Sequence, residues 1–168
     1  MALVIEDGTG QPDAESYSDA SDADQHVTKW RQSSSWDAAS TAAKERSLRR
    51  ATRFVDSYRF LGSRGFEDQA LSWPRVNVGF VDGREIFRDQ LPAAIKEATM
   101  EAAIRDAEGE SLLTDHDGGT VKSESRSVGP MQKQTDYAAP KTAGKRFEAI
   151  EALLRPFTTR NKLTRSIA

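Results

Sequence analysis

The chain has 168 residues, a length that suits one domain with one hydrophobic core. Lys plus Arg number 24 and Asp plus Glu 26, and the formal net charge of −2 excludes a bulk polyanion binder. The absence of cysteine excludes disulfides, thiol catalysis and thiolate metal sites, and it fits a reducing compartment. No run approaches the ~18 apolar residues of a transmembrane helix, so no membrane association is expected.

Charge is distributed unevenly along the chain. Residues 1–28 contain acidic residues but no Lys or Arg, whereas residues 152–168 contain basic residues but no acid. Ends of opposite sign suit head-to-tail contact between identical subunits, or docking of two different partners. Two solvated tails would produce the same pattern.

The first elements are predicted to be an extended arm and a helix. A short apolar run at residues 3–5 is broken by turn residues, which predicts a small strand or an extended arm. A helix is then expected to start near Ser21. Ala23, Val27 and Trp30 are predicted to form its buried side.

The clearest helix is predicted to run from a cap at Ser40 or Thr41 to about Tyr58. One face of this helix is predicted to be buried, because apolar residues recur on it at helical spacing: Leu48, Ala51, Val55 and Tyr58. Arginines recur at similar spacing on another face. These are Arg46, Arg49, Arg50 and Arg53.

Residues 66–91 predict a loop with embedded turns, one of them a tight turn at Asp82-Gly83. Its many apolar and aromatic side chains predict that the loop packs on the core instead of being disordered. Pro92 is expected at the first position of a helix that ends at Gly109. This alanine-rich helix is apolar on more than one side, which predicts that it is the central helix.

The chain becomes polar after Gly109, and alternating residues at about 120–137 predict a two-stranded excursion. Such a hairpin is marginal alone in water, so pairing or packing against another subunit is expected to order it. A flexible surface loop is the alternative. The residues that would make the inter-subunit contact are Lys122, Glu124, Arg126 and Val128.

A final helix is predicted from near Thr142 to Arg155, where Pro156 closes it. The elements together predict a mainly α fold: a small bundle of about four helices, a projecting polar β-hairpin and extended terminal arms. The chain is accordingly divided into a domain at 1–156 and a basic tail at 157–168.

The sequence contains few residues that suggest catalysis or metal binding. The run from Asp115 through His116 to Gly119 fails the spacing of a calcium loop and is interpreted as a flexible turn. His26 is interpreted as a surface histidine, and Glu101 as a surface charge paired with Arg105. No phosphate-binding loop or nucleophile elbow is present. We therefore predict no enzyme activity, no cofactor and no metal.

The arginine face of the 41–58 helix allows two interpretations. Its guanidinium groups can follow a phosphate backbone, or they can form a solvated face with local ion pairs to Glu45 and Asp56. Trp73 can stack a base. Since no platform of exposed aromatic and basic residues surrounds it in the sequence, core packing is predicted for Trp73.

An ordered set of short motifs resembles a family of phage proteins, and it spans about residues 1–156. The stretch Leu71-Ser72-Trp73-Pro74-Arg75 carries most of the resemblance. The other matching stretches are Leu3 to Gly10 with Pro12, Ala14, Ser16 and Tyr17; Ala42 to Tyr58 with Arg50-Ala51-Thr52 and Asp56; Gln69-Ala70; Asp82-Gly83-Arg84; Leu91-Pro92 with Ala94, Ile95 and Ala98; Lys122-Ser123-Glu124; Val128-Gly129-Pro130; and Ala149 to Leu154.

The set is similar to the head–tail connector proteins of long-tailed bacteriophages, also called adaptor or head-completion proteins. This resemblance implies a helical subunit that assembles into a ring of about twelve copies under the portal protein, with genomic double-stranded DNA passing through its centre. It further implies contact with a tail-side neck, stopper or tail-terminator protein. The subunit would be made in the bacterial cytoplasm and reside in the virion neck.

Within this interpretation, the arginine face is expected to line the DNA channel, and Trp73 with Pro74 is a structural core motif. The basic tail is expected to dock on the portal. The tail residues concerned are Arg160, Lys162, Leu163, Arg165 and Ile167. Related sequences are also labelled DnaT-like single-stranded DNA-binding proteins, and this alternative requires Trp73 or Tyr58 to be exposed beside the arginine face.

Overall fold

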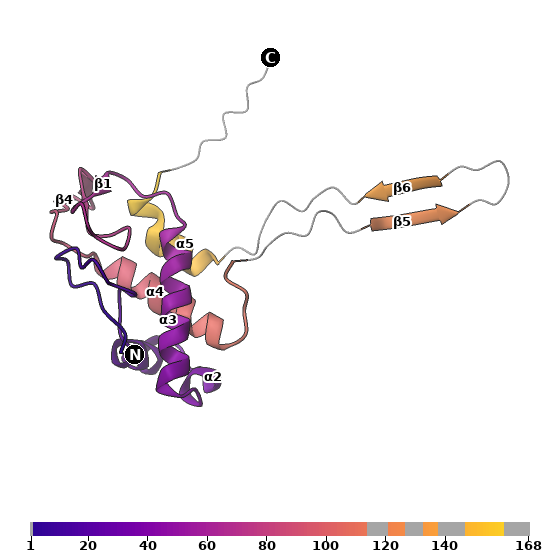
Figure 1. Cartoon of the computed structure of the whole chain (residues 1–168), viewed down its shortest axis with the longest axis horizontal. Coiled ribbons are helices and arrows are strands. Elements are labelled where there is room, and N and C mark those ends of the chain that lie inside the picture. The colour runs from indigo at the N-terminus through magenta and orange to yellow at the C-terminus, as the bar shows by residue number, and fades with distance from the viewer. Residues whose placement is uncertain (1, 114–120, 127–132, 138–146, 160–168) are drawn as a thin grey trace, which may run out of the picture. The chain divides into compact units, whose positions relative to one another are not determined.

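A computed structural model of the chain describes residues 2–113, 121–126, 133–137 and 147–159. The structure contains two compact units, Met1–Leu112 with Phe147–Ala168, and Leu113–Arg146. The helices are α1 (Ala20–Trp30), α2 (Ser34–Asp37), α3 (Thr41–Asp56), α4 (Ala93–Ala107), α5 (Glu148–Leu154) and the 3-10 helix η1 (Arg155–Phe157). The predicted mainly α fold is confirmed (Figure 1).

The strands are short and pair only as antiparallel two-stranded ribbons in the described part of the chain. They are β1 (Ser63–Arg64) with β2 (Arg75–Val76), β3 (Phe80–Val81) with β4 (Arg84–Glu85), and β5 (Val121–Arg126) with β6 (Lys133–Tyr137).

Helix α4 is the centre of the first unit, as predicted. It contacts α1, α2, α3 and α5, and α3 crosses it in Figure 1. Ile95 and Ile104 are fully buried, and so are Ala98, Ala102 and Ala103, whose small side chains let neighbouring backbones approach closely. Pro92, which was predicted to be the first residue of this helix, is its N-cap, so α4 begins one residue later than predicted, at Ala93.

Helix α3 begins where predicted, because the side chain of Ser40 accepts a hydrogen bond from the backbone N–H of Ala43. Leu48, Ala51 and Val55 are fully buried, which confirms the predicted apolar face at these three positions, whereas Tyr58 lies beyond the end of α3 and is half-buried. This face packs mainly against α4. The opposite side of α3 is free to carry the arginines.

Helix α1 starts at Ala20, one residue before the predicted start, because Asp19 caps it by accepting from the backbone N–H of Asp22. Ala23 and Val27 are buried as predicted, but Trp30 is 75% exposed. That part of the prediction is wrong, since Trp30 is the last residue of the helix and Arg31 turns the chain into an extended conformation.

His26, and not Trp30, is the third buried residue of α1. It is only 9% exposed, and its Nε2 lies 3.0 Å from Oε1 of Glu101 on α4. The interpretation of His26 as a surface histidine is therefore wrong. Helix α2, which was not predicted, similarly buries Trp36, whose indole N–H donates to Asp24 at 2.7 Å.

The 66–91 segment packs around Trp73, which is fully buried as predicted. The rings of Phe60 and Phe157 meet the indole edge-on, with centroids 5.7 and 5.6 Å away. Asp82 and Gly83 have φ values of 49° and 78°, which confirms the predicted tight turn between β3 and β4.

Two aromatic side chains of this segment remain outside the core. Phe80 is 74% exposed and Phe87 is 61% exposed, so the prediction that the loop aromatics are buried is wrong for these two residues. The β3–β4 ribbon has two residues per strand and makes few contacts with the helices, which leaves its outer face uncovered.

The N-terminal arm is held by one buried carboxylate. The side chain of Glu6 accepts hydrogen bonds from the backbone N–H groups of Gly8, Gly10 and Gln11 at 2.8 to 2.9 Å. A Cβ on Gly10 would meet the ring of Phe66 at 2.4 Å, so a glycine is required where the arm approaches the 66–91 segment.

The C-terminal helix α5 buries Phe147, Ile150 and Leu154. Phe157 is also buried, although it was predicted to lie at the start of the basic tail. Its carbonyl accepts from the backbone N–H of Leu61 at 2.8 Å, so the core continues beyond residue 156. Residues 160–168, with the predicted portal-docking residues, lie outside the described residues.

The second unit contains the predicted polar hairpin. Strands β5 and β6 pair with Arg126 opposite Lys133 and Glu124 opposite Thr135, and the register shifts between Val121 and Ser123. Lys122, Glu124 and Arg126 are positions on β5. Val128 lies outside the described residues.

The two tryptophans at positions 73 and 30 provide a matched test of this core. Trp73→Ala removes a fully buried ring and is expected to lower the free energy of unfolding by about 3–5 kcal/mol. Trp30→Ala removes an exposed ring and should change it by less than about 0.5 kcal/mol. Urea unfolding of both variants measures the difference, and equal effects would contradict this assignment of the core.

Candidate functional site: the arginine face of helix α3

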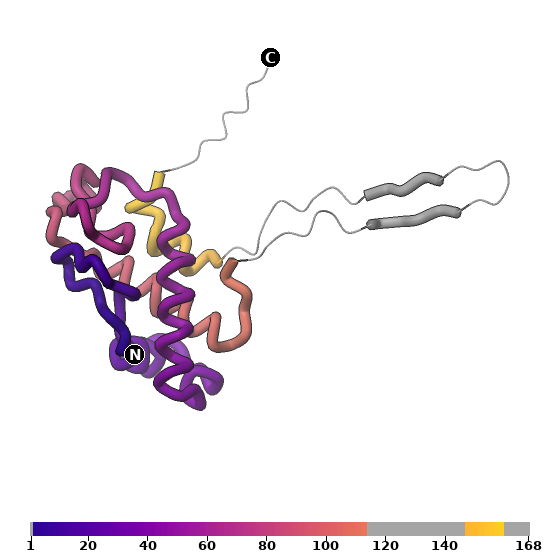
Figure 2. Tube along the Cα trace, viewed as in Figure 1, coloured from indigo at the N-terminus to yellow at the C-terminus, as the bar shows by residue number. Residues whose placement is uncertain are grey.

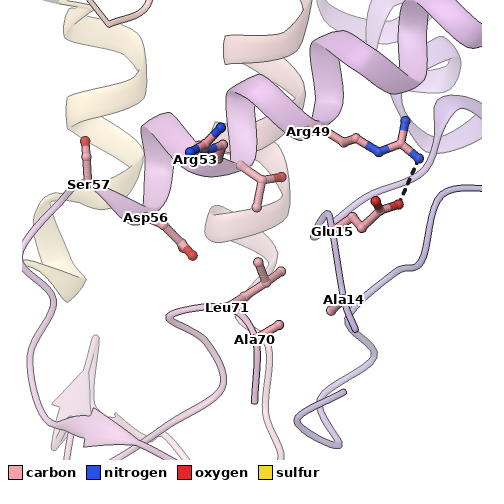
Figure 3. Close-up of a pocket in the computed structure, with 9 residues that line it drawn as sticks. Ala14, Glu15, Arg49, Arg53, Asp56, Ser57, Ala70 and Leu71 are labelled. Atoms are coloured by element: carbon pink, nitrogen blue, oxygen red, sulfur yellow. Dashed lines mark hydrogen bonds and ion pairs between the residues drawn. The ribbon is translucent and has the colours of Figure 1, made fainter. Parts of the chain in front are cut away.

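The exposed side of α3 borders a pocket of about 530 Å³. The N-terminal arm and the segment around Leu71 form its other walls (Figure 3). The lining residues are Ala14, Glu15, Arg49, Thr52, Arg53, Asp56, Ser57, Ala70 and Leu71. Two of the four predicted arginines therefore reach the same surface depression.

Arg49 is paired with carboxylates of its own chain. Its Nη2 donates to Glu15 at 2.8 Å (Figure 3). Its Nη1 lies 3.7 Å from Glu45. The hydrogen bond between Arg49 and Glu15 raises the pKa of Arg49 and lowers the pKa of Glu15. The predicted local pair with Glu45 is confirmed, and the pair with Glu15 adds a link between α3 and the arm.

Arg50 is paired across to α4. Its Nε lies 2.8 and 3.0 Å from the two carboxylate oxygens of Asp106, and its Nη2 also donates to that group. This bidentate arrangement raises the pKa of Arg50. The side chain thus joins the two helices that make the largest contact in the unit.

Arg46 and Arg53 differ from their neighbours. Both are exposed, and neither forms an ion pair with any residue in the described ranges. The predicted ion pair between the arginine face and Asp56 is wrong, because the carboxylate of Asp56 makes its hydrogen bonds elsewhere. Only two of the four guanidinium groups are available to a ligand without breaking an internal pair.

Asp56 instead holds the 66–91 segment against the end of α3. One carboxylate oxygen accepts from the hydroxyl of Tyr17, and the other accepts from the backbone N–H of Ser72 at 3.0 Å. The Tyr17 hydroxyl in turn accepts from the backbone N–H of Trp73 at 3.0 Å. Burial raises the pKa of Asp56, and burial together with the neighbouring Asp56 charge raises the pKa of Tyr17 well above its ordinary value.

The two aromatic side chains that base stacking at this site would require, those of Trp73 and Tyr58, pack against other residues of the fold. Trp73 is fully buried. Tyr58 is half-buried and packs edge-on against Phe54, with ring centroids 5.5 Å apart. The pocket wall therefore offers guanidinium and carboxylate groups, and its lining contains no aromatic side chain.

A second charged cluster, which was not predicted, joins α1 to α4. Glu101 accepts from Arg105 at 3.0 Å, as predicted, and also contacts His26 and Arg31. Arg31 further pairs with Glu108. The separation of about 70 residues between these partners explains why helical spacing alone did not identify them.

The described ranges contain no group of three or more His, Asp or Glu side chains placed to hold a metal ion. Nor do they contain a helix with the length and apolar character needed to span a bilayer. The arginine face of α3 is suited to contact with a negatively charged surface. The internal ion pairs of Arg49 and Arg50 limit the strength of that contact.

Fold and site define a small, mainly α protein with a largely charge-balanced arginine surface. Residues 1–167 match the family described as "Putative DnaT-like ssDNA binding protein", and the chain belongs to that family. No curated protein matches the chain, and no solved structure does. The recognition of a DnaT-like group from the motifs is confirmed.

The environments of Asp56 and Asp24 predict opposite responses to pH. Because the pKa of Asp56 is raised in the folded state, the fold binds that proton more tightly than the unfolded chain does. The stability of the natural protein relative to Asp56→Asn should therefore increase as pH falls from 7 toward 4.

Asp24 provides the contrast. Burial raises its pKa, but hydrogen bonds from Lys44 and Trp36 outweigh that effect and lower it. The stability of the natural protein relative to Asp24→Asn should therefore decrease as pH falls through the acidic range. Thermal unfolding of the three proteins between pH 3 and 7 measures both trends, and trends of the same sign would contradict the pKa assignments.

A second prediction concerns the paired arginines. The double variant Glu15→Gln/Asp106→Asn removes partners of Arg49 and Arg50 and should raise affinity for duplex DNA. Each further phosphate that the freed arginines neutralise should steepen the salt dependence of log K by about 0.9. Asp37→Asn/Glu148→Gln removes the same charge at exposed positions elsewhere and is the control. Equal behaviour of the two variants in fluorescence anisotropy would show that internal pairing does not limit DNA contact.

Proposed function

We propose that the protein is a structural subunit of the phage neck, which forms a ring that joins the portal to the tail and surrounds the DNA exit channel. The observation that carries this proposal is the internal pairing of Arg49 and Arg50. A channel wall must tolerate a polyanion while letting it slide. Uncompensated arginines would bind phosphates and slow that movement.

The extent of the core also supports an assembling subunit. The helices bury one compact core, but large aromatic side chains remain exposed at Trp30, Phe80 and Phe87. Large aromatic side chains are enriched at protein–protein interfaces relative to the rest of a protein surface. The motif resemblance, which runs through the Leu71-to-Arg75 stretch, points to the same assembly.

The family description favours a second function, single-stranded DNA binding. The free guanidinium groups of Arg46 and Arg53 are the specific feature that supports it. Stacking usually supplies much of the affinity for single strands, and the buried Trp73 gives no stacking surface at this site. We therefore place this function second.

The test is to mix the full-length protein with portal rings of its phage and to image the product by electron microscopy. A ring stacked on the portal is expected, and the image would give its copy number. In parallel, binding to labelled oligo(dT) at moderate salt should be weak. No association with the portal, together with tight oligo(dT) binding, would overturn the neck function and establish the second one.

A truncation localises the portal contact. Removal of residues 160–168 takes away the predicted docking residues and spares Phe157, whose burial makes it part of the core. We expect this variant to retain its thermal unfolding midpoint and to lose portal attachment. Attachment at natural strength would show that the docking residues lie elsewhere in the chain.

A further inference from the structure

Four large apolar side chains in the described part of the chain are more than half exposed, and three of them form two separate patches. The first patch is Trp30 at the end of α1. The second is Phe80 on β3 together with Phe87, which follows β4 by two residues. Figures 1 and 2 place these two elements at opposite ends of α3. We call them the tryptophan patch and the phenylalanine patch.

The tryptophan patch is concave. Trp30 borders an open pocket of about 200 Å³ between α1 and α4, in which Met100 is the other apolar residue and the remaining lining is polar or charged. A cavity of about 150 Å³ is enough to hold a benzene ring. The pocket therefore has room for one phenyl side chain, and methionine is a side chain that adapts to an inserted ring.

The phenylalanine patch flanks an exposed hairpin turn. Phe80 and Glu85 are directly opposite each other in the ribbon, and the Asp82-Gly83 turn lies beyond them. Of the charged residues from 82 to 88, two are acidic and two are basic: Asp82, Glu85, Arg84 and Arg88. A charge-neutral aromatic knob is poorly suited to a phosphate backbone and well suited to a protein pocket.

Charges at the two patches are complementary. Asp22 and Glu97 line the pocket, and their carboxylates pair with no residue in the described ranges. Arg84 on the ribbon is exposed and equally without an ion-pair partner there. In the other direction, Lys29 at the pocket can meet Glu85 of the ribbon.

We infer that the phenylalanine patch of one copy of this chain inserts into the tryptophan patch of the next copy. Because the two patches differ and lie at opposite ends, the contact is heterologous and can repeat around a ring. Each aromatic side chain would contribute about 150–250 Å² to a standard interface of about 1,600 Å². This inference rests on the proposed ring function and identifies the surfaces that build the ring.

The test uses two variants that each block one patch, Trp30→Glu and Phe80→Glu. Both positions are largely exposed, so both variants should unfold thermally like the natural protein. Under conditions where the natural protein forms rings on the portal, neither variant alone should form them. Ala152→Glu places the same charge on an exposed position of α5 and should leave assembly unchanged.

Mixing the two blocked variants gives the decisive result. Trp30→Glu keeps its phenylalanine patch and Phe80→Glu keeps its tryptophan patch, so one productive contact remains and a 1:1 heterodimer is expected by analytical ultracentrifugation. An isologous contact between two like patches would give no such heterodimer. Full assembly of either single variant would overturn the inference while leaving the ring function intact, whereas failure of the natural protein to assemble would overturn both.

Cross-linking locates the contact directly. The chain contains no cysteine, so Lys29→Cys beside the pocket in one copy and Glu85→Cys opposite Phe80 in another are this chain's only thiols in a mixture of the two variants, and Trp30 and Phe80 stay intact in both. We expect a disulfide between the two variants on the portal at least about tenfold faster than between copies of Glu85→Cys alone. Equal rates would contradict the proposed contact, and retention on labelled oligo(dT) that depends on Phe80 would assign the knob to nucleic acid.

Discussion

The fold depends on how Trp73 is held against the end of α3. The buried indole packs between Phe60 and Phe157. Polar side chains of the N-terminal arm and of α3 fix the backbone around it. Tyr17 and Asp56 accept the hydrogen bonds of residues 72 and 73. A partly buried carboxylate and hydroxyl stabilise a fold only when they have hydrogen-bond partners, and the backbone N–H groups of Ser72 and Trp73 provide those partners. The N-terminal arm, α3 and the 66–91 segment are therefore stabilised together.

This arrangement also explains why the arginine face has its particular charge. Since Asp56 is turned toward Tyr17, it does not neutralise Arg53. Glu15, which lies two residues before Tyr17, is brought next to Arg49 by the same arm. Packing of the Trp73 segment thus leaves Arg53 free and brings a partner to Arg49, whereas Arg50 is paired independently by Asp106 of α4.

Local patterns predicted the elements well and the exposure of single residues less well. Helical spacing identified the buried face of α3, and the Asp82-Gly83 dipeptide identified the β3–β4 turn, because both signals depend only on neighbours in sequence. Trp30 was misplaced because its exposure is determined by where α1 ends relative to α4. Spacing also cannot show that Asp106 would face Arg50 across 56 residues. The partial charge balance of the arginine face therefore could not be predicted without the tertiary structure.

The exposed aromatics and the balanced arginines have a common physical basis if copies of the chain stand side by side around DNA. A ring encloses many copies of every inward-facing residue, so a small excess charge on one subunit is multiplied by the copy number. Pairing Arg49 and Arg50 internally limits this sum, while Arg46 and Arg53 leave a modest positive field. The energy that holds the ring must then come from contacts between subunits and not from DNA. The exposed aromatic side chains of the two patches would supply such contacts without adding charge to the channel.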